Sequence, residues 1–128
     1  MQAEEQARLR LAQELAVEAA ARDRLVSAAS RLSVARAVER GASGGQLAAR
    51  QAYIERCEQD VGAAATALSL QQSLVEQARE ALAVAAQERE ALERLKERGR
   101  AEHELESRRA EDEALGEVAL AAHRRKVA

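Results

Sequence analysis

The segment Gly41-Ala42-Ser43-Gly44-Gly45 decides the fold, because it is the one place where clustered residues signal a turn. Three of its five residues are glycine, and each glycine costs about 1 kcal/mol relative to alanine when it is forced into a helix. Residues 3–40 contain neither Gly nor Pro, and helix-forming residues resume at Gln46 and continue nearly to the C-terminus. The sequence therefore predicts two long helices, over about residues 3–40 and 46–126, joined by a tip at residues 41–45.

The second predicted helix contains three isolated glycines, Gly62, Gly99 and Gly116, and no cluster of turn-forming residues accompanies them. We therefore expect this helix to be continuous. A five-residue tip joins only antiparallel neighbours, so Leu32 is expected to lie near Ile54. At 1.5 Å per residue, the second helix is about twice as long as the first. Its C-terminal half is expected to overhang, to pair with another chain, or to meet an N-terminal extension.

A heptad seam runs along the second helix from Ile54. Alternate steps of three and four residues reach apolar residues at ten of twelve positions: Ile54, Cys57, Val61, Ala64, Leu68, Gln71, Val75, Ala78, Leu82, Ala85, Arg89 and Leu92. A repeat of seven residues predicts a left-handed coiled coil. Large side chains alternate with mostly small ones along this seam, which favours a close antiparallel partner.

The first helix supplies that partner with a looser repeat. Its candidate seam residues are Leu11, Leu15, Ala19, Leu25, Ala29, Leu32 and Ala35. A strict heptad would instead bring Glu18, Arg22 or Arg36 near the seam, so the register of this helix stays open. The expected fold is all-α, a single coiled-coil domain over residues 1–128 in which two helices form an antiparallel hairpin.

The composition excludes several classes of protein. Ala, Leu, Glu, Arg and Lys make up about two thirds of the 128 residues, while Pro, Phe and Trp are absent. Without aromatic rings to fill a core, a compact enzyme domain is not expected. The net charge of −2 and the mixed signs along the chain do not indicate nucleic acid as a partner. The sequence has no apolar run long enough to span a membrane and no signal peptide. Its single cysteine agrees with a reducing compartment, so we expect a cytoplasmic protein.

Residues that carry chemistry are too few and too scattered to form a catalytic site. His103 and His123 are twenty residues apart, and the sole thiol is at Cys57. Metal sites need several convergent ligands, which these residues do not offer. A phosphate-binding loop needs a Lys and then a hydroxyl residue directly after its glycines, and the glycines of residues 41–45 are not followed by this pair. The sequence therefore predicts no enzymatic activity, no metal and no cofactor.

Two residues near the tip stand out from the helical background. Cys57 lies on the seam, which favours a buried small side chain over a reactive thiol. Tyr53 is the only aromatic residue and lies beside Ile54, one step off the seam. An exposed aromatic near a rim is often a binding anchor, and a capping contact over the tip is the alternative.

The C-terminal part of the second helix differs in composition from the rest. Residues 93–114 contain 14 charged side chains, which predicts a solvated surface. Apolar residues then return at Leu115, Val118, Ala119, Leu120 and Ala122, beside a basic cluster of Arg124, Arg125 and Lys126. This end of the chain offers a docking surface for a partner.

Several segments together resemble the FliJ family, small coiled-coil components of the flagellar type III export apparatus. They are Gln46-Leu47 followed by residues 51–58 (Gln-Ala-Tyr-Ile-Glu-Arg-Cys-Glu), residues 88–98 (Glu-Arg-Glu-Ala-Leu-Glu-Arg-Leu-Lys-Glu-Arg) and residues 108–115 (Arg-Arg-Ala-Glu-Asp-Glu-Ala-Leu). The resemblance covers most of the chain in layout. It implies a central stalk for the export ATPase ring, similar in role to the gamma subunit of rotary ATPases.

The resemblance also implies partners and a location. The partners are the export ATPase ring, the cytoplasmic domain of the membrane export gate, and export chaperones that some members handle. The location is cytoplasmic, peripheral to the membrane-embedded export apparatus, without direct membrane insertion. Tyr53 and Cys57 fall where the family places an aromatic and an aliphatic residue in its gate-binding patch, and Leu25 and Leu32 are the candidates on the first helix.

Two alternatives stay open at the level of the sequence. One is a structural homodimeric coiled coil that pairs chains through residues 87–126, and the other is the equivalent stalk of a type III injectisome. A membrane-surface amphipathic helix is disfavoured, because Lys is scarce, Trp and Phe are absent, and the polar face is balanced in charge.

Overall fold

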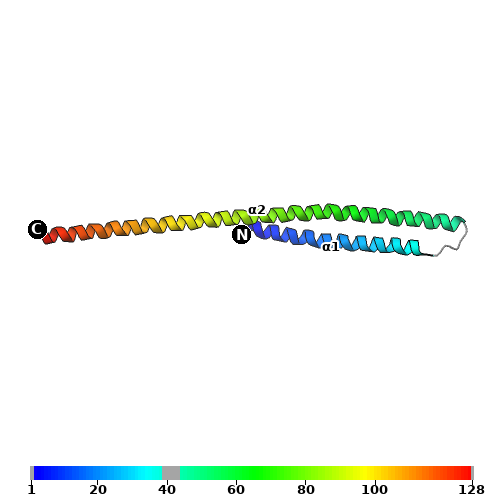
Figure 1. Ribbon diagram of the computed structural model, residues 1–128, viewed down its shortest axis with the longest axis horizontal. Helices are drawn as coiled ribbons and strands as arrows, with labels where there is room; N and C mark the ends of the chain where they lie inside the picture. The colour runs from blue at the N-terminus through cyan, green and yellow to red at the C-terminus, as the bar shows by residue number, and fades with distance from the viewer. Residues whose placement is uncertain (1, 39–43, 128) are drawn as a thin grey trace. The chain divides into compact units, whose positions relative to one another are not determined.

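The computed structural model describes residues 2–38 and 44–127, and these form two helices, α1 over Gln2–Ala37 and α2 over Gly44–Val127. No strand occurs among them. The contacts divide the chain into two compact units, Met1–Ala86 and Gln87–Ala128. Within the first unit, α1 packs along the beginning of α2 in the opposite direction (Figure 1). The all-α hairpin with a longer second helix is confirmed.

The helix ends near the turn differ by a few residues from those that the sequence predicts. α1 ends at Ala37, three residues before residue 40, and the Val38 N–H donates to the Val34 carbonyl at 3.2 Å. Residues 41–43 of the predicted tip lie outside the described residues, whereas Gly44 and Gly45 begin α2. The first N–H groups of a helix have no intrahelical acceptor, so glycine there weakens the helix less than in its interior.

The seam of α1 follows the strict heptad repeat. Its buried and half-buried positions alternate by three and four residues along the whole helix: Glu4, Ala7, Leu11, Glu14, Glu18, Ala21, Leu25, Ala28, Leu32 and Ala35. Leu15, Ala19 and Ala29, which were expected on the seam, are exposed. These three residues are exposed because the seven-residue repeat places Glu14 and Glu18 on the face toward α2, although both are charged.

The seam of α2 lies where the heptad pattern predicts it. Every predicted position from Ile54 to Arg89 is buried or half-buried, and Val75 and Ala78 are among the most buried. Leu92, the last predicted position, is half exposed. All residues from Ala91 to Val127 are exposed.

Two contacts between the helices define the register of the hairpin. The Arg50 guanidinium donates to the Ala35 carbonyl at 3.5 Å, and the Gln71 side-chain amide donates to the Glu14 carbonyl at 3.0 Å. Ala35 and Glu14 are 21 residues apart in α1, and Arg50 and Gln71 are 21 residues apart in α2. The antiparallel register is therefore constant over three heptads.

The two halves of this interface differ in polarity. Near the turn, Leu32, Ala35 and Cys57 form a buried apolar cluster, and Ile54 and Val61 pack against it. In the half of α1 that is remote from the turn, three seam positions are glutamates. Ion pairs within α1 hold two of these carboxylates, Glu4 with Arg8 at 2.9 Å and Glu18 with Arg22 at 2.8 Å. The apolar half therefore supplies most of the packing energy.

Candidate binding surface near the turn

The four residues proposed for partner binding occupy different depths in the hairpin. Leu32 and Cys57 are buried at 9% and 4% exposure and belong to the same apolar cluster. Leu25 is half-buried, one heptad before Leu32 on α1. Tyr53 is 44% exposed. Of the four, Tyr53 offers its side chain most fully to a partner, while Leu32 and Cys57 fix the helices beneath it.

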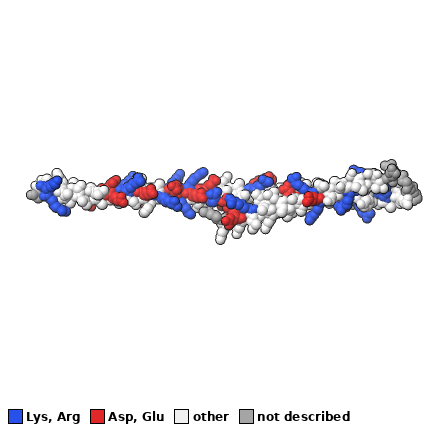
Figure 2. All heavy atoms as spheres, turned by 90° about the horizontal axis from the view of Figure 1, so that it is seen from below, with Lys and Arg blue, Asp and Glu red and all other residues white. Residues whose placement is uncertain are grey.

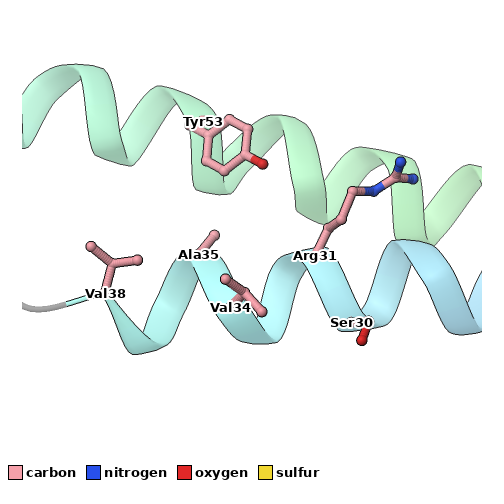
Figure 3. Close-up of a pocket in the computed structure, with 6 residues that line it drawn as sticks. All are labelled: Ser30, Arg31, Val34, Ala35, Val38 and Tyr53. Atoms are coloured by element: carbon pink, nitrogen blue, oxygen red, sulfur yellow. The ribbon is translucent and has the colours of Figure 1, made fainter.

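A shallow hollow of about 290 Å³ lies between Tyr53 and the last two turns of α1. Figure 3 shows the six residues around it, with Ala35 directed toward the Tyr53 ring and Arg31 reaching toward α2. Opposite Tyr53 the hollow is lined by Ser30, Arg31, Val34 and Ala35 of α1 and by Val38, which follows α1. Val34 and Val38 are both more than half exposed, although they are large apolar residues. We call this feature the Tyr53 hollow, and its walls are mainly apolar.

A second hollow, of about 340 Å³, also borders Tyr53 and is charged. Its lining comprises Arg31, Tyr53, Arg56, Cys57 and Asp60. The Arg56 guanidinium carbon lies 5.7 Å from the centroid of the Tyr53 ring, within the range of a cation–π interaction. Tyr53 therefore stands between an apolar surface and a surface that carries two cations and one carboxylate.

The surroundings of the Tyr53 hydroxyl raise its pKa. Hydrogen bonding with the Cys57 side chain is the main cause that raises the pKa of Tyr53 above 10.0, and the electrostatic interaction with Cys57 and partial burial raise it further. Arg31 and Arg56 act on this pKa in the opposite direction. The phenol is thus neutral at physiological pH.

Polar contacts from α2 fix the end of α1 that forms the hollow. The last carbonyls of a helix lack intrahelical donors, and a cation near them is favoured by the helix dipole. Arg50 meets this need by donating to the carbonyls of Ala35 and Arg36, at 3.5 and 3.2 Å. Arg36 in turn pairs with Glu58 at 3.1 Å. These contacts set the position of Val34 and Val38 relative to Tyr53.

The sequence interpretation did not single out Arg31, Val34, Val38 or Arg50. A signal for Arg50 exists, because it continues the α2 seam one step before Ile54, where it must face the end of α1. Val34 and Val38 are four residues apart and so share a helix face, but only the register of α2 reveals that this face borders Tyr53. The predicted capping contact of Tyr53 with residues 41–43 lies outside the described residues.

Two other kinds of site are absent from the described part of the chain. It holds no group of three or more His, Cys, Asp or Glu side chains that is arranged to bind a metal ion. Within the same residues, neither helix includes a stretch that is both long and apolar enough to cross a membrane. The surface around Tyr53 is therefore the strongest candidate site in the first unit.

Comparison with known families identifies the chain. A profile of the family described as Flagellar FliJ protein matches residues 1–128. The chain belongs to the FliJ family. The resemblance seen in the sequence is thereby confirmed, and FliJ membership makes the protein a component of the flagellar export apparatus. No curated protein and no solved structure matches the chain.

Proposed function

We propose that this chain is a non-enzymatic stalk that couples the export ATPase ring of the flagellar apparatus to the cytoplasmic domain of the membrane export gate. The observation that carries the proposal is the FliJ match over the whole chain, together with the antiparallel hairpin of α1 and α2. On this proposal the protein works on the cytoplasmic side, peripheral to the membrane-embedded apparatus. Escort of export chaperones belongs to the same proposal and is supported by family membership.

The hairpin suits contact with several ring subunits at once. Two packed helices present side chains on all outer faces, and ion pairs such as Arg36–Glu58 show that both signs of charge lie on them. Contacts of this kind are individually weak and are screened by salt. Catalysis needs a site that excludes water, and both hollows beside Tyr53 are open to solvent, so on this proposal ATP hydrolysis belongs to the partner.

The Tyr53 hollow is the surface that we assign to the export gate. An exposed ring beside two exposed valines gives a partner an apolar anchor point, and Arg31 and Arg56 give it charged contacts at the edge. Leu25, Leu32 and Cys57 contribute from beneath, since they hold the two helices at the spacing that the hollow requires.

The export role is tested by adding the purified chain to the export ATPase at low salt. We expect the two proteins to associate and ATP hydrolysis to accelerate, with both effects declining as salt is added. Absence of association and of stimulation at low salt would refute the stalk.

The gate contact is tested separately with Tyr53→Ala, measured against the isolated cytoplasmic domain of the gate. Loss of a central aromatic anchor is expected to weaken binding about thirtyfold, equivalent to about 2 kcal/mol. Leu70→Ala is the control, because Leu70 is an exposed apolar residue of α2, at 65% exposure, that is not part of the hollow. Equal effects of the two substitutions would contradict the assignment of the hollow.

A further inference from the structure

Residues 111–126, near the C-terminal end of α2, combine an apolar stripe with charged residues at both ends of the stripe. Leu115, Val118, Ala119 and Ala122 follow the spacing of one helix face, and Leu115 and Val118 are 67% and 66% exposed. An acidic pair, Glu111 and Asp112, precedes the stripe, and a basic pair, Arg125 and Lys126, follows it. Figure 2 shows the basic end as a blue group, separated by a largely uncharged stretch from the next acidic residues.

The charged pairs are placed symmetrically about the centre of the stripe. Glu111 lies seven residues before Val118, and Lys126 lies seven residues after Ala119. Both also share the face of the stripe, since Glu111 is four residues before Leu115 and Lys126 is four residues after Ala122. At 1.5 Å per residue, each charge lies about 11 Å from the midpoint between Val118 and Ala119.

We propose that residues 111–126 form an antiparallel helix pair with the same residues of a second copy of this chain. A two-fold axis beside the midpoint brings the acidic end of each copy against the basic end of the other. The same axis sets Leu115 against Ala122 and Val118 against Ala119, so large residues meet small ones. A parallel pair would instead place acidic residues against acidic residues and basic against basic, which is destabilising.

A second copy is the occupant that this segment specifies. Both halves of the charge pattern, as well as both the large and the small residues of the stripe, occur within the same residues 111–126. Any helix that covers this segment must offer basic residues at one end, acidic residues at the other and small residues opposite the large ones, and an antiparallel copy of the segment meets all three conditions. The short stripe and its exposed charges give a weak dimer that salt dissociates.

The pairing is tested on the full chain by sedimentation velocity at low salt over a range of concentrations. The wild-type mass is expected to rise from 13.9 kDa toward twice that value. Glu111→Lys with Asp112→Lys makes both ends basic, and Arg125→Glu with Lys126→Glu makes both ends acidic. Each double variant alone is expected to weaken the dimer by about tenfold or more, and an equimolar mixture of the two is expected to restore it.

A matched control changes charges on the far side of the same segment. Glu113 and Arg124 lie about opposite Leu115 around the helix, so exchanging them by Glu113→Lys with Arg124→Glu is expected to leave dimerisation unchanged. Circular dichroism of every variant checks that helix content is retained. A wild-type chain that stays monomeric overturns the proposal, because another molecule must then cover the stripe. A dimer that is insensitive to the charge variants also overturns it.

The orientation is tested by disulfide formation in a Cys57→Ala background. Two copies of Ala119→Cys lie next to the two-fold axis and are expected to cross-link. The two cysteines of an Ala122→Cys dimer are instead separated by about 10 Å along the direction of the helices, which is beyond the reach of a disulfide. Cross-linking through Ala122→Cys in preference to Ala119→Cys indicates parallel chains and overturns the proposal.

Discussion

Residues 54–85 and 91–127 of α2 belong to one continuous helix and are built largely from the same helix-forming residues, yet their surroundings differ completely. In the first segment, side chains spaced alternately by three and four residues are shielded by α1, and Ala78 is fully buried. In the second, every residue is exposed. Helix propensity is common to both segments, so it does not decide which of them is paired. The first segment carries a sustained heptad repeat that faces α1, whereas the second carries only the short stripe at Leu115, Val118, Ala119 and Ala122.

The largest expected effect comes from shortening a seam residue in the paired segment. Leu32→Ala removes a buried side chain from the apolar cluster and is expected to destabilise the hairpin by about 2 kcal/mol, or about 10 °C in melting temperature. Leu105→Ala is the matched change in the exposed segment, at a residue that is 50% exposed, and is expected to shift stability by less than about 0.5 kcal/mol. Thermal denaturation followed by circular dichroism measures both, and equal shifts would contradict the comparison.

A smaller effect is expected when a small seam residue is enlarged. Ala78→Leu forces extra methyl groups into a site with no exposed surface, which costs about 1.5 kcal/mol. Ala101→Leu makes the same change on an exposed face and should be nearly neutral. Urea unfolding of the two variants compares them directly, and a stable Ala78→Leu chain would show that the helices are not closely packed.

Glycine replacements are expected to act in the opposite direction. A Cβ added at Gly62 or Gly99 meets no atom within 4 Å, so alanine at either site should favour the helix by about 0.5 to 1 kcal/mol. Gly62→Ala should raise the melting temperature of the hairpin. Gly99→Ala should raise the helix content of its own segment and leave the hairpin transition in place. A fall in helix content for either variant would oppose this reading.

The smallest expected effect concerns the titration of Tyr53, the only aromatic residue of the chain. Tyrosinate absorbance should titrate with a midpoint above pH 10, and Cys57→Ala should move the midpoint down by removing the main cause of the raised pKa. Because the folded pKa is the higher one, the associated stability is present below pH 10 and is lost as the pH rises through the folded pKa. An unchanged midpoint in the variant would rule out the link to Cys57.

The sequence predicted the α2 seam well, because its positions are apolar and the period could be followed directly. It misplaced Leu15, Ala19 and Ala29 of α1, because Glu14 and Glu18 occupy seam positions and hide the repeat. The identity of Tyr53 as an exposed residue near the turn was also accessible from the sequence.

Other parts of the site could not be predicted in the same way. The neighbours of Tyr53 in the hollow, Val34 and Val38, depend on the register between two helices, which local patterns do not encode. That register rests on long-range contacts such as Gln71 with Glu14 and Arg50 with Ala35.

Hydrogen exchange along α2 is the most direct test of the claim that the heptad seam determines which part of this helix is paired. Amides of residues 54–75, which face the apolar half of α1, are expected to be the most protected, and those of residues 95–110 are expected to exchange fastest. Uniform protection along the whole of α2, or stronger protection after residue 95 than before it, would contradict the claim.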